Sequence, residues 1–155
     1  MANAVHDQSV LRNFRFDTKE VDWKDFITAG CYYKLLDVNV AAQTADMLVK
    51  FEPGARCMYH RHVAPATSLV LEGELHIIDQ TSTGEALRTV KPAGTYTSGV
   101  EDDVHVEGGG ENGVIVYFSM RGSSDRIYDL LDSKLNLKRA ITIHDFAKDL
   151  ASWVR

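Results

Sequence analysis

A succession of short β-type runs, separated by turn signals, is the feature that most limits the folds open to this chain. The runs read CYYKLLDVNV, ADMLVKFEPG, RCMYHRHV, TSLVLEG, ELHIIDQ, ALRTVKPAG, TYTSGV, VHVEGG, GVIVYFSMRG and IYDLLD. Alternation is clearest where Met47, Val49 and Phe51 share one face and Asp46 and Lys50 share the other. Many short strands at close spacing predict an all-β barrel or sandwich.

The length and net charge of the chain further restrict the kind of protein that it can be. At 155 residues the chain can bury a hydrophobic core and is predicted to form one domain. A net charge of -5 gives no electrostatic case for binding nucleic acid, which needs clustered Lys and Arg. The longest apolar runs are too short to cross a bilayer, and MANAVHDQSVLRNF lacks the apolar core of a signal peptide. Because Cys31 and Cys57 have neither zinc nor redox spacing, we expect reduced thiols and a cytoplasmic protein.

The C-terminal segment ITIHDFAKDLASWVR predicts a helix. Its apolar residues fall near helical spacing and form one stripe: Ile143, Phe146, Leu150 and Trp153. Thr142, followed three residues later by Asp145, resembles a capping box in which Asp replaces the usual Glu. We expect this helix to pack on the outside of the barrel, with binding of a partner by the same stripe as the alternative.

The predicted organisation has three parts. Residues 1–30 are an irregular lead-in, with a helical turn at VDWKDF as one option. Residues 31–122 form the barrel, and residues 123–155 add a hairpin and the helix. Within the barrel, Gly73 and the run Gly108–Gly110 are expected to mark turns between strands.

Three histidines carry the strongest functional signal. His60 and His62 form a His-x-His pair, and His105 follows in GTYTSGVEDDVHVEGGG. Alternating residues on a strand point to the same face, so the pair aims two imidazoles at one point. A histidine from another strand can then complete one face of a metal ion. Imidazole binds Fe, Ni, Cu and Zn alike, so these ligands alone do not name the metal.

The spacing around the histidine pair resembles the first motif of the cupin superfamily, whose members are double-stranded β-helix (jelly-roll) barrels. That motif is G-x5-H-x-H-x3/4-E-x6-G, and the segment from Gly54 to Gly73 matches it except at the glutamate. Ala66 or, with the longer gap, Thr67 stands at the glutamate position. The departure concerns a residue that most metal cupins use as a ligand.

A second segment resembles the second cupin motif, G-x5-P-x-G-x2-H-x3-N. Gly94 and His105 match, whereas Val100, Asp102 and Gly109 replace its Pro, Gly and Asn. Two motifs in the right order imply a cupin fold over roughly residues 31–122, with a metal held by the three histidines.

Three-histidine cupins include dioxygenases that act on acetylacetone (a β-diketone) and on 2,4'-dihydroxyacetophenone. The resemblance therefore implies a non-haem Fe(II) enzyme that uses O₂ to cleave a C–C bond of a small diketone or hydroxyketone. Without a carboxylate ligand, the 2+ charge of the metal favours an anionic, bidentate substrate such as an enolate. Zn(II) or Ni(II) is the alternative metal, and no catalytic residue beyond the metal ligands is predicted.

The cupin half of ChrR-type anti-sigma factors is also similar. It implies an alternative in which the three histidines hold Zn(II) in a sensor or binding protein without catalysis. A metal-dependent isomerase or lyase that needs no oxygen is the third reading. Because cupins commonly pair through sheet edges, the resemblance also implies a homodimer.

Strand parity predicts which other side chains surround the metal. The expected pocket residues are Met58, Ser68, Val70, Tyr96 and Phe118. Such a pocket is apolar with few polar groups, as small-ligand sites commonly are. Plain core packing is the alternative for Met58, Val70 and Phe118, because similar side chains fill barrel interiors.

Two charged residues are further candidates. Glu107 lies two residues after His105 and could orient a ligand histidine, act as a base or supply a fourth ligand. A solvated position beside the glycine run is its alternative. Arg56 could steer an anionic substrate, with a surface salt bridge as its alternative.

The remaining candidates are set aside or left open. Cys57 has a parity opposite to the histidine pair and is not expected to be a ligand. His76 follows a turn on a strand and can face inward or outward. His6 and His144 fall outside the motifs and are expected on the surface.

Overall fold

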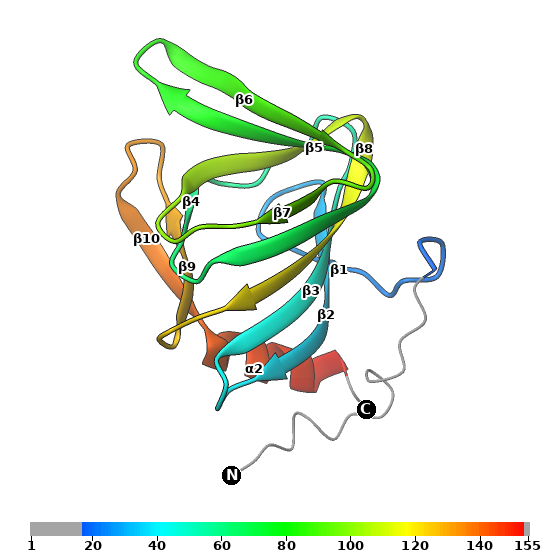
Figure 1. The fold of residues 1–155 in the computed structure, drawn as a ribbon, viewed down its shortest axis with the longest axis vertical. Coiled ribbons are helices and arrows are strands. Elements are labelled where there is room, and N and C mark those ends of the chain that lie inside the picture. The colour runs from blue at the N-terminus through cyan, green and yellow to red at the C-terminus, as the bar shows by residue number, and fades with distance from the viewer. Residues whose placement is uncertain (1–16, 154–155) are drawn as a thin grey trace.

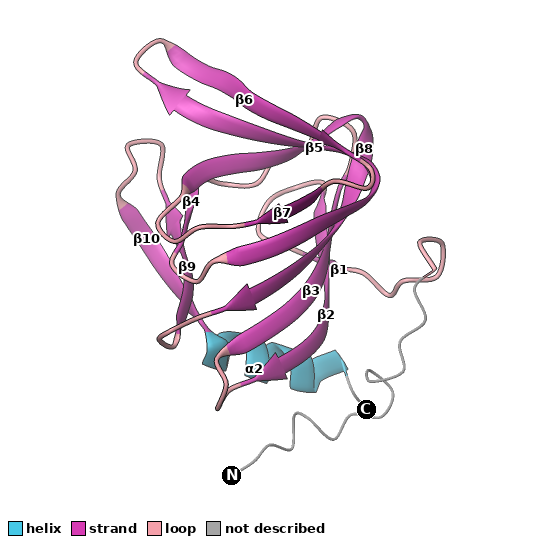
Figure 2. Ribbon diagram, in the orientation of Figure 1, coloured by secondary structure: helices cyan, strands magenta, loops and turns pink. Residues whose placement is uncertain are grey.

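The computed structural model describes residues 17–153, which form a curled antiparallel sheet and one helix (Figure 1). The elements are β1 (Lys24–Asp25), β2 (Cys31–Asn39), β3 (Thr44–Phe51), β4 (His60–His62), β5 (Ala66–Thr81), β6 (Gly84–Pro92), β7 (Tyr96–Ser98), β8 (Val104–Arg121), β9 (Arg126–Leu131), β10 (Leu137–Thr142) and α2 (Ile143–Trp153). Strands dominate the described chain, and the helix stands at its C-terminal end (Figure 2). The predicted all-β jelly roll with a C-terminal helix is confirmed.

The two longest strands, β5 and β8, connect the two halves of the sheet. The C-terminal half of β8 pairs with β3 and with the first half of β5. Its N-terminal half pairs with β4 and with the second half of β5. Strand order along the main path is β1-β2-β3-β8-β4-β9-β10, with β5, β6 and β7 off this path. The histidine pair on β4 therefore lies directly beside the start of β8.

The glycines predicted to mark turns lie inside these long strands instead. Gly73 is within β5, and Gly108–Gly110 is within β8. At Gly73 φ is 71°, and a Cβ there would lie 2.0 Å from the Gly113 carbonyl oxygen. Only glycine fits such a close approach of two backbones. The β5–β8 register shifts on both sides of this point, so the strands bend without ending.

Two segments on either side of the predicted barrel also contribute strands to the sheet. The segment VDWKDF contains the short strand β1, in which Lys24 and Asp25 pair with β2, and so it forms no helical turn. Strand β9 pairs with β4 on one side and with β10 on the other. The strands β9 and β10 of segment 123–155, where a hairpin was predicted, thus extend the curled sheet.

The core lies between the two halves of the sheet. Met47, Val49 and Phe51 of β3 are buried, as their alternation predicts. Their partners in register on β8 are also buried: Phe118, Val116 and Val114. Burying side chains of this size contributes about 1.5–3 kcal/mol each, so these rows hold the two halves together.

Helix α2 packs against β2, mainly along its apolar stripe (Figure 1). The residues of the stripe that are buried are Ile143, Phe146 and Leu150. The predicted capping box is present, because Asp145 Oδ2 accepts from the Thr142 amide at 2.8 Å and Thr142 Oγ1 accepts from the Asp145 amide at 3.3 Å. Tyr33 on β2 donates its hydroxyl hydrogen to Asp149 on the helix. No helix in residues 17–153 is both long and apolar enough to span a membrane.

Candidate metal centre

Strand register brings four possible metal ligands to one point of the barrel. His60 on β4 pairs directly with His105 on β8. Because alternate strand residues share a face, His62 and Glu107 lie on the same side as these two. All four residues are buried, and their ligand atoms lie within 4.8 Å of one another. The two neighbouring strands thus present a His₃Glu cluster to the barrel interior.

The distances within the cluster match the needs of a single ion. His62 Nε2 lies 3.0 Å from His60 Nε2 and 3.2 Å from His105 Nε2. Glu107 Oε1 lies 3.1 Å from His60 Nε2 and 3.6 Å from His105 Nε2. Ligands about 2.1 Å from an ion and at right angles to each other are roughly 3.0 Å apart. These pairs of atoms are therefore spaced close to neighbouring ligands, and His62 Nε2 and Glu107 Oε1 are farther apart, at 3.9 Å.

The outer nitrogens of two imidazoles fix which way their lone pairs point. His60 Nδ1 donates to the Met58 carbonyl oxygen at 3.1 Å, and His105 Nδ1 donates to Asp103 Oδ2 at 2.9 Å. When these two rings are neutral, with the proton on Nδ1, each Nε2 presents a lone pair to the centre of the cluster. Burial lowers the pKa of His60, but Cys57 and Glu107 raise it well above its usual value, so without a metal a proton can lie between His60 and Glu107. This donor set fits a metal ion.

The cluster also has a defined charge. Burial alone raises the pKa of Glu107, but contacts from His105 and His60 outweigh it and leave that pKa well below its usual range. The carboxylate is therefore ionised. Burial lowers the pKa of His62 to about 3, helped by the charge of His60, so this imidazole is neutral and able to bind a metal.

Glu107 corrects the prediction of three neutral ligands. The carboxylate that is absent from Ala66 and Thr67 comes instead from β8, two residues after His105. Such a site compensates part of the charge of a divalent ion. The argument that uncompensated metal charge selects an anionic substrate therefore loses its basis. Of the three roles weighed for Glu107, the geometry fits a fourth ligand.

A second carboxylate, that of Asp103, supports the cluster from outside and was not among the predicted site residues. Asp103 accepts from His105 Nδ1 and from Arg88 Nη1, which lies 3.0 Å from both of its oxygens. Partial burial raises the pKa of Asp103, but Arg88 and His105 outweigh it and leave that pKa below its usual range. An ionised carboxylate behind a ligand histidine fixes the ring and makes it a better donor.

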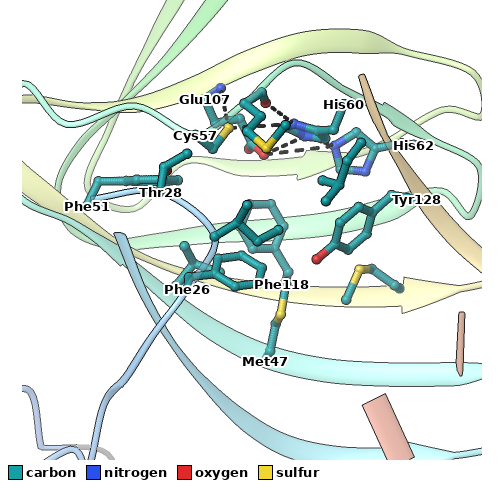
Figure 3. Close-up of a pocket in the computed structure, with 15 residues that line it drawn as sticks. Phe26, Thr28, Met47, Phe51, Cys57, His60, His62, Glu107, Phe118 and Tyr128 are labelled. Atoms are coloured by element: carbon teal, nitrogen blue, oxygen red, sulfur yellow. Dashed lines mark hydrogen bonds and ion pairs between the residues drawn. The ribbon is translucent and has the colours of Figure 1, made fainter. Parts of the chain in front are cut away.

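One face of the cluster opens onto an apolar cavity of about 40 Å³ (Figure 3). Its walls are Phe26, Ile27, Thr28, Met47, Val49, Phe51, Cys57, Met58, Phe118, Met120, Tyr128 and Leu130, with His60, His62 and Glu107 at one end. The Tyr128 hydroxyl points into this cavity (Figure 3) and has no hydrogen-bond partner within residues 17–153. Tyr128 and Leu130 lie on β9, where they are the register partners of His62 and His60 on β4.

The predicted pocket residues lie in different places in the structure. Met58 and Phe118 line the apolar cavity, and Ser68 lines a second cavity on the other side of the cluster. Val70 is a core residue, 1% exposed and paired with Val116, and it lines neither cavity. The placement of Tyr96 was wrong, because its side chain is 66% exposed. On β7 it is Thr97, in register with Ser68, that faces inward.

The other charged and thiol candidates lie around the site. Arg56 forms a surface ion pair with Glu85 and does not reach the cluster. Cys57 was excluded by strand parity, but it precedes β4 in an irregular segment where parity does not hold. Its Sγ lies 3.6 Å from His60 Nδ1 and accepts from the Glu107 amide at 3.1 Å. Cys57 therefore touches the outer side of His60 and not the ligand side.

Two histidines stand apart from the cluster. His76 is partly exposed, with Nε2 3.9 Å from Glu74. His144 is on the surface, as predicted, where it pairs with Asp125 at 3.0 Å. The third predicted surface residue of this group, His6, lies outside the described residues.

Comparisons with known proteins agree with this fold. The model of the ChrR cupin-like domain family matches residues 11–124. An acetylacetone dioxygenase from Acinetobacter johnsonii has a similar structure, with a TM-score of 0.71, 12% identity and 90% of each chain covered. A protein assigned as an acetylacetone dioxygenase from Methylibium petroleiphilum gives 0.65 and 20%, covering 89% of this chain and 94% of its own.

An RmlC-like cupin protein from Ralstonia eutropha is similar as well. Its TM-score is 0.70 at 14% identity, and the match covers 88% of this chain and 83% of that protein. No functionally curated protein sequence matches the chain. At these identities the structural likeness shows the fold, and the chemistry has to be argued from the site.

Proposed function

Because the chain belongs to the family of ChrR cupin-like domains, we propose that its cluster holds a catalytic metal ion. The proposed activity is that of a non-haem Fe(II) dioxygenase that cleaves a C–C bond of a small diketone or hydroxyketone. One observation carries the proposal: four buried ligand atoms stand at the end of an apolar cavity. The acetylacetone dioxygenases with a similar fold support the choice of substrate class.

His60, His62, His105 and Glu107 would hold the ion. When bound, Fe(II) supplies a Lewis acid toward a ketone oxygen and a redox centre for O₂. The apolar walls exclude water and favour a substrate with few polar groups. Within this cavity the Tyr128 hydroxyl is placed to donate a hydrogen bond to a ketone or enolate oxygen. Its phenol remains protonated at neutral pH, because burial raises the pKa of Tyr128 above its usual range.

Oxygen consumption tests the proposal directly. The protein is loaded with Fe(II) without oxygen and then exposed to O₂ with a panel of 1,3-diketones and hydroxyacetophenones. We expect substrate-dependent oxygen uptake that is absent in His62→Ala and retained in His144→Ala, a surface control. Tightly held zinc in the purified protein, together with no oxygen uptake after iron loading, would refute a dioxygenase.

The second candidate is a zinc-holding sensor or binding domain without catalysis. The ChrR family match and the small size of the cavity, about 40 Å³, favour it. It predicts stoichiometric zinc and a large loss of thermal stability after chelation, with no turnover. Conversion of the same ketones in the absence of oxygen would instead indicate an isomerase or lyase.

A further inference from the structure

A second cavity, of about 60 Å³, lies on the other side of the metal-ligand cluster. It shares His62, Glu107 and Phe118 with the apolar cavity, so the cluster lies between the two. Its remaining lining residues are Ala66, Ser68, Ile77, Lys91, Thr97, Gly99, Val100, Asp103 and His105. Unlike the first cavity, it contains an ammonium group, that of Lys91, which stands together with the hydroxyls of Ser68 and Thr97. We call it the polar cavity.

Strand register aims these polar groups at the cluster. Lys91 on β6 pairs with the buried Leu75, so it lies on the inward face of the sheet. Ile77, two residues along β5 from Leu75, pairs with Glu107 on β8 and shares that face. Ser68 and Thr97 are register partners between β5 and β7. Three strands thus direct Lys91, Ser68 and Thr97 into one space.

These three side chains have no partner within residues 17–153. No carboxylate lies within ion-pair distance of Lys91 in that range. The Ser68 side chain is 4% exposed, and neither its hydroxyl nor that of Thr97 forms a hydrogen bond to a described residue. In residues 17–153 the fully buried side-chain N and O atoms without a partner are Tyr59 Oη and His62 Nδ1, so the hydroxyls of Ser68 and Thr97 reach the surface of the cavity, where they can bind a ligand or ordered water.

The acidic groups that face the polar cavity are already compensated. Asp103 is held by the Arg88 guanidinium and by His105. Glu107 Oε1 is directed at the imidazoles of the cluster. Lys91 is therefore the cation of this cavity, within the described chain, that has no carboxylate partner. An ammonium with two neighbouring hydroxyls suits a small oxyanion.

We propose that the polar cavity binds a small carboxylate, held by Lys91 and by the hydroxyls of Ser68 and Thr97. The carboxylate is that of an acid product of the C–C cleavage at the cluster, and in this respect the inference rests on the proposed function. An aliphatic acid of a few carbon atoms matches a space of about 60 Å³, whereas a bulky aromatic acid does not.

Titration of the purified protein with acetate, propionate and naphthoate tests the proposal. Binding is followed by calorimetry and by the amide NMR signals of Thr97 and Gly99. We expect saturable binding of the two small acids and none of naphthoate. Lys91→Met should weaken binding roughly 10- to 100-fold, since it removes a charge-assisted hydrogen bond, and Ser68→Ala should weaken it about 3- to 10-fold.

Two further variants separate the site from general effects. Lys91→Arg keeps the charge and should retain binding within a few-fold. Lys148→Met removes a lysine of helix α2, outside the polar cavity, and should leave binding unchanged. Equal affinity in wild type and Lys91→Met, as expected for a carboxylate that coordinates only a metal, would overturn the proposal. So would the absence of saturation.

The outcome is distinct from that of the dioxygenase test. Lys91-dependent carboxylate binding without oxygen uptake on any ketone would retain the polar cavity and reject the dioxygenase. Oxygen uptake with no carboxylate binding would retain the dioxygenase and reject the cavity assignment.

Discussion

Replacing Glu107 by glutamine tests whether the carboxylate on β8 is a metal ligand. Glutamine keeps the shape of the side chain and removes its charge. Glu107 is 6% exposed and contacts the three cluster histidines, with its Oε1 3.1 Å from His60 Nε2. If it binds the ion, Glu107→Gln removes one of four ligands and the only negative charge among them. If its role is only to fill space, the isosteric change should have little effect.

The expected loss of metal affinity can be bounded. Residues that merely support metal ligands cost about 10- to 100-fold in affinity when removed. A direct, charged ligand should cost at least the upper value, about 100-fold or 2.7 kcal/mol. Competition with a chromophoric chelator measures this for Zn(II) and Fe(II). A loss of less than about threefold would refute a ligand role for Glu107.

The metal-free protein gives the matching control through its pH dependence. The pKa of Glu107 is held below its ordinary value of 4.5, so its interactions add stability above that pH. Burial lowers the pKa of His60, but Cys57 and Glu107 outweigh it, so protonated His60 adds stability below about pH 6.5. Wild type should therefore exceed Glu107→Gln in unfolding free energy most clearly between pH 4.5 and 6.5. A constant difference up to pH 9 would contradict this pairing.

Three further predictions concern single contacts. Asp103→Ala should lower metal affinity about 10- to 100-fold by freeing His105, measured by the same chelator competition, and unchanged affinity would reject the support role. Tyr128→Phe should leave metal affinity unchanged and reduce kcat/KM for a ketone about 3- to 10-fold, and full activity would rule out the proposed hydrogen bond. Leu150→Ala should lower the unfolding free energy by roughly 3–5 kcal/mol in urea titrations, because Leu150 is fully buried under the helix. A loss below about 1 kcal/mol would show that the helix contributes little to the core.

Much of the fold was predictable because alternation and capping are local signals. Met47, Val49 and Phe51 reveal a buried face, and Thr142 with Asp145 reveals a helix start. The strand ends were not predictable from glycine. A glycine with positive φ can end a strand or let a continuous strand bend, and only the close approach at Gly73 decides between these. The two-residue strand β1 exists only through its pairing with β2.

The site residues could be predicted where strand parity holds, and their prediction failed where it does not. Glu107 shares the parity of His105, but the glycines that follow suggested a turn and obscured that relation. Cys57 lies in an irregular segment and lines the apolar cavity despite its parity, but the prediction that it is not a ligand holds. On β7, the register with Ser68 shows that Thr97 points inward and that Tyr96 does not. A strand of three residues is too short for its hydrophobic pattern to predict which face is buried.

The absent motif glutamate and the polar cavity meet at residue 66. Ala66 occupies the place where the cupin motif has glutamate, and its small side chain lines the polar cavity beside His62 and Ser68. Because the carboxylate of the cluster comes from Glu107 on β8, the space beside residue 66 is open to a ligand. Ala66→Glu should fill that room and abolish binding of acetate.

In the Glu107→Gln background, the same Ala66→Glu change should recover much of the lost metal affinity by restoring a fourth ligand from β5. Thr67→Glu is the matched control, because position 67 has the opposite strand parity and lines neither cavity. Recovery by Thr67→Glu, or none by Ala66→Glu, would show that residue 66 does not face the metal. Acetate binding that survives in Ala66→Glu would separate the cavity from the motif position.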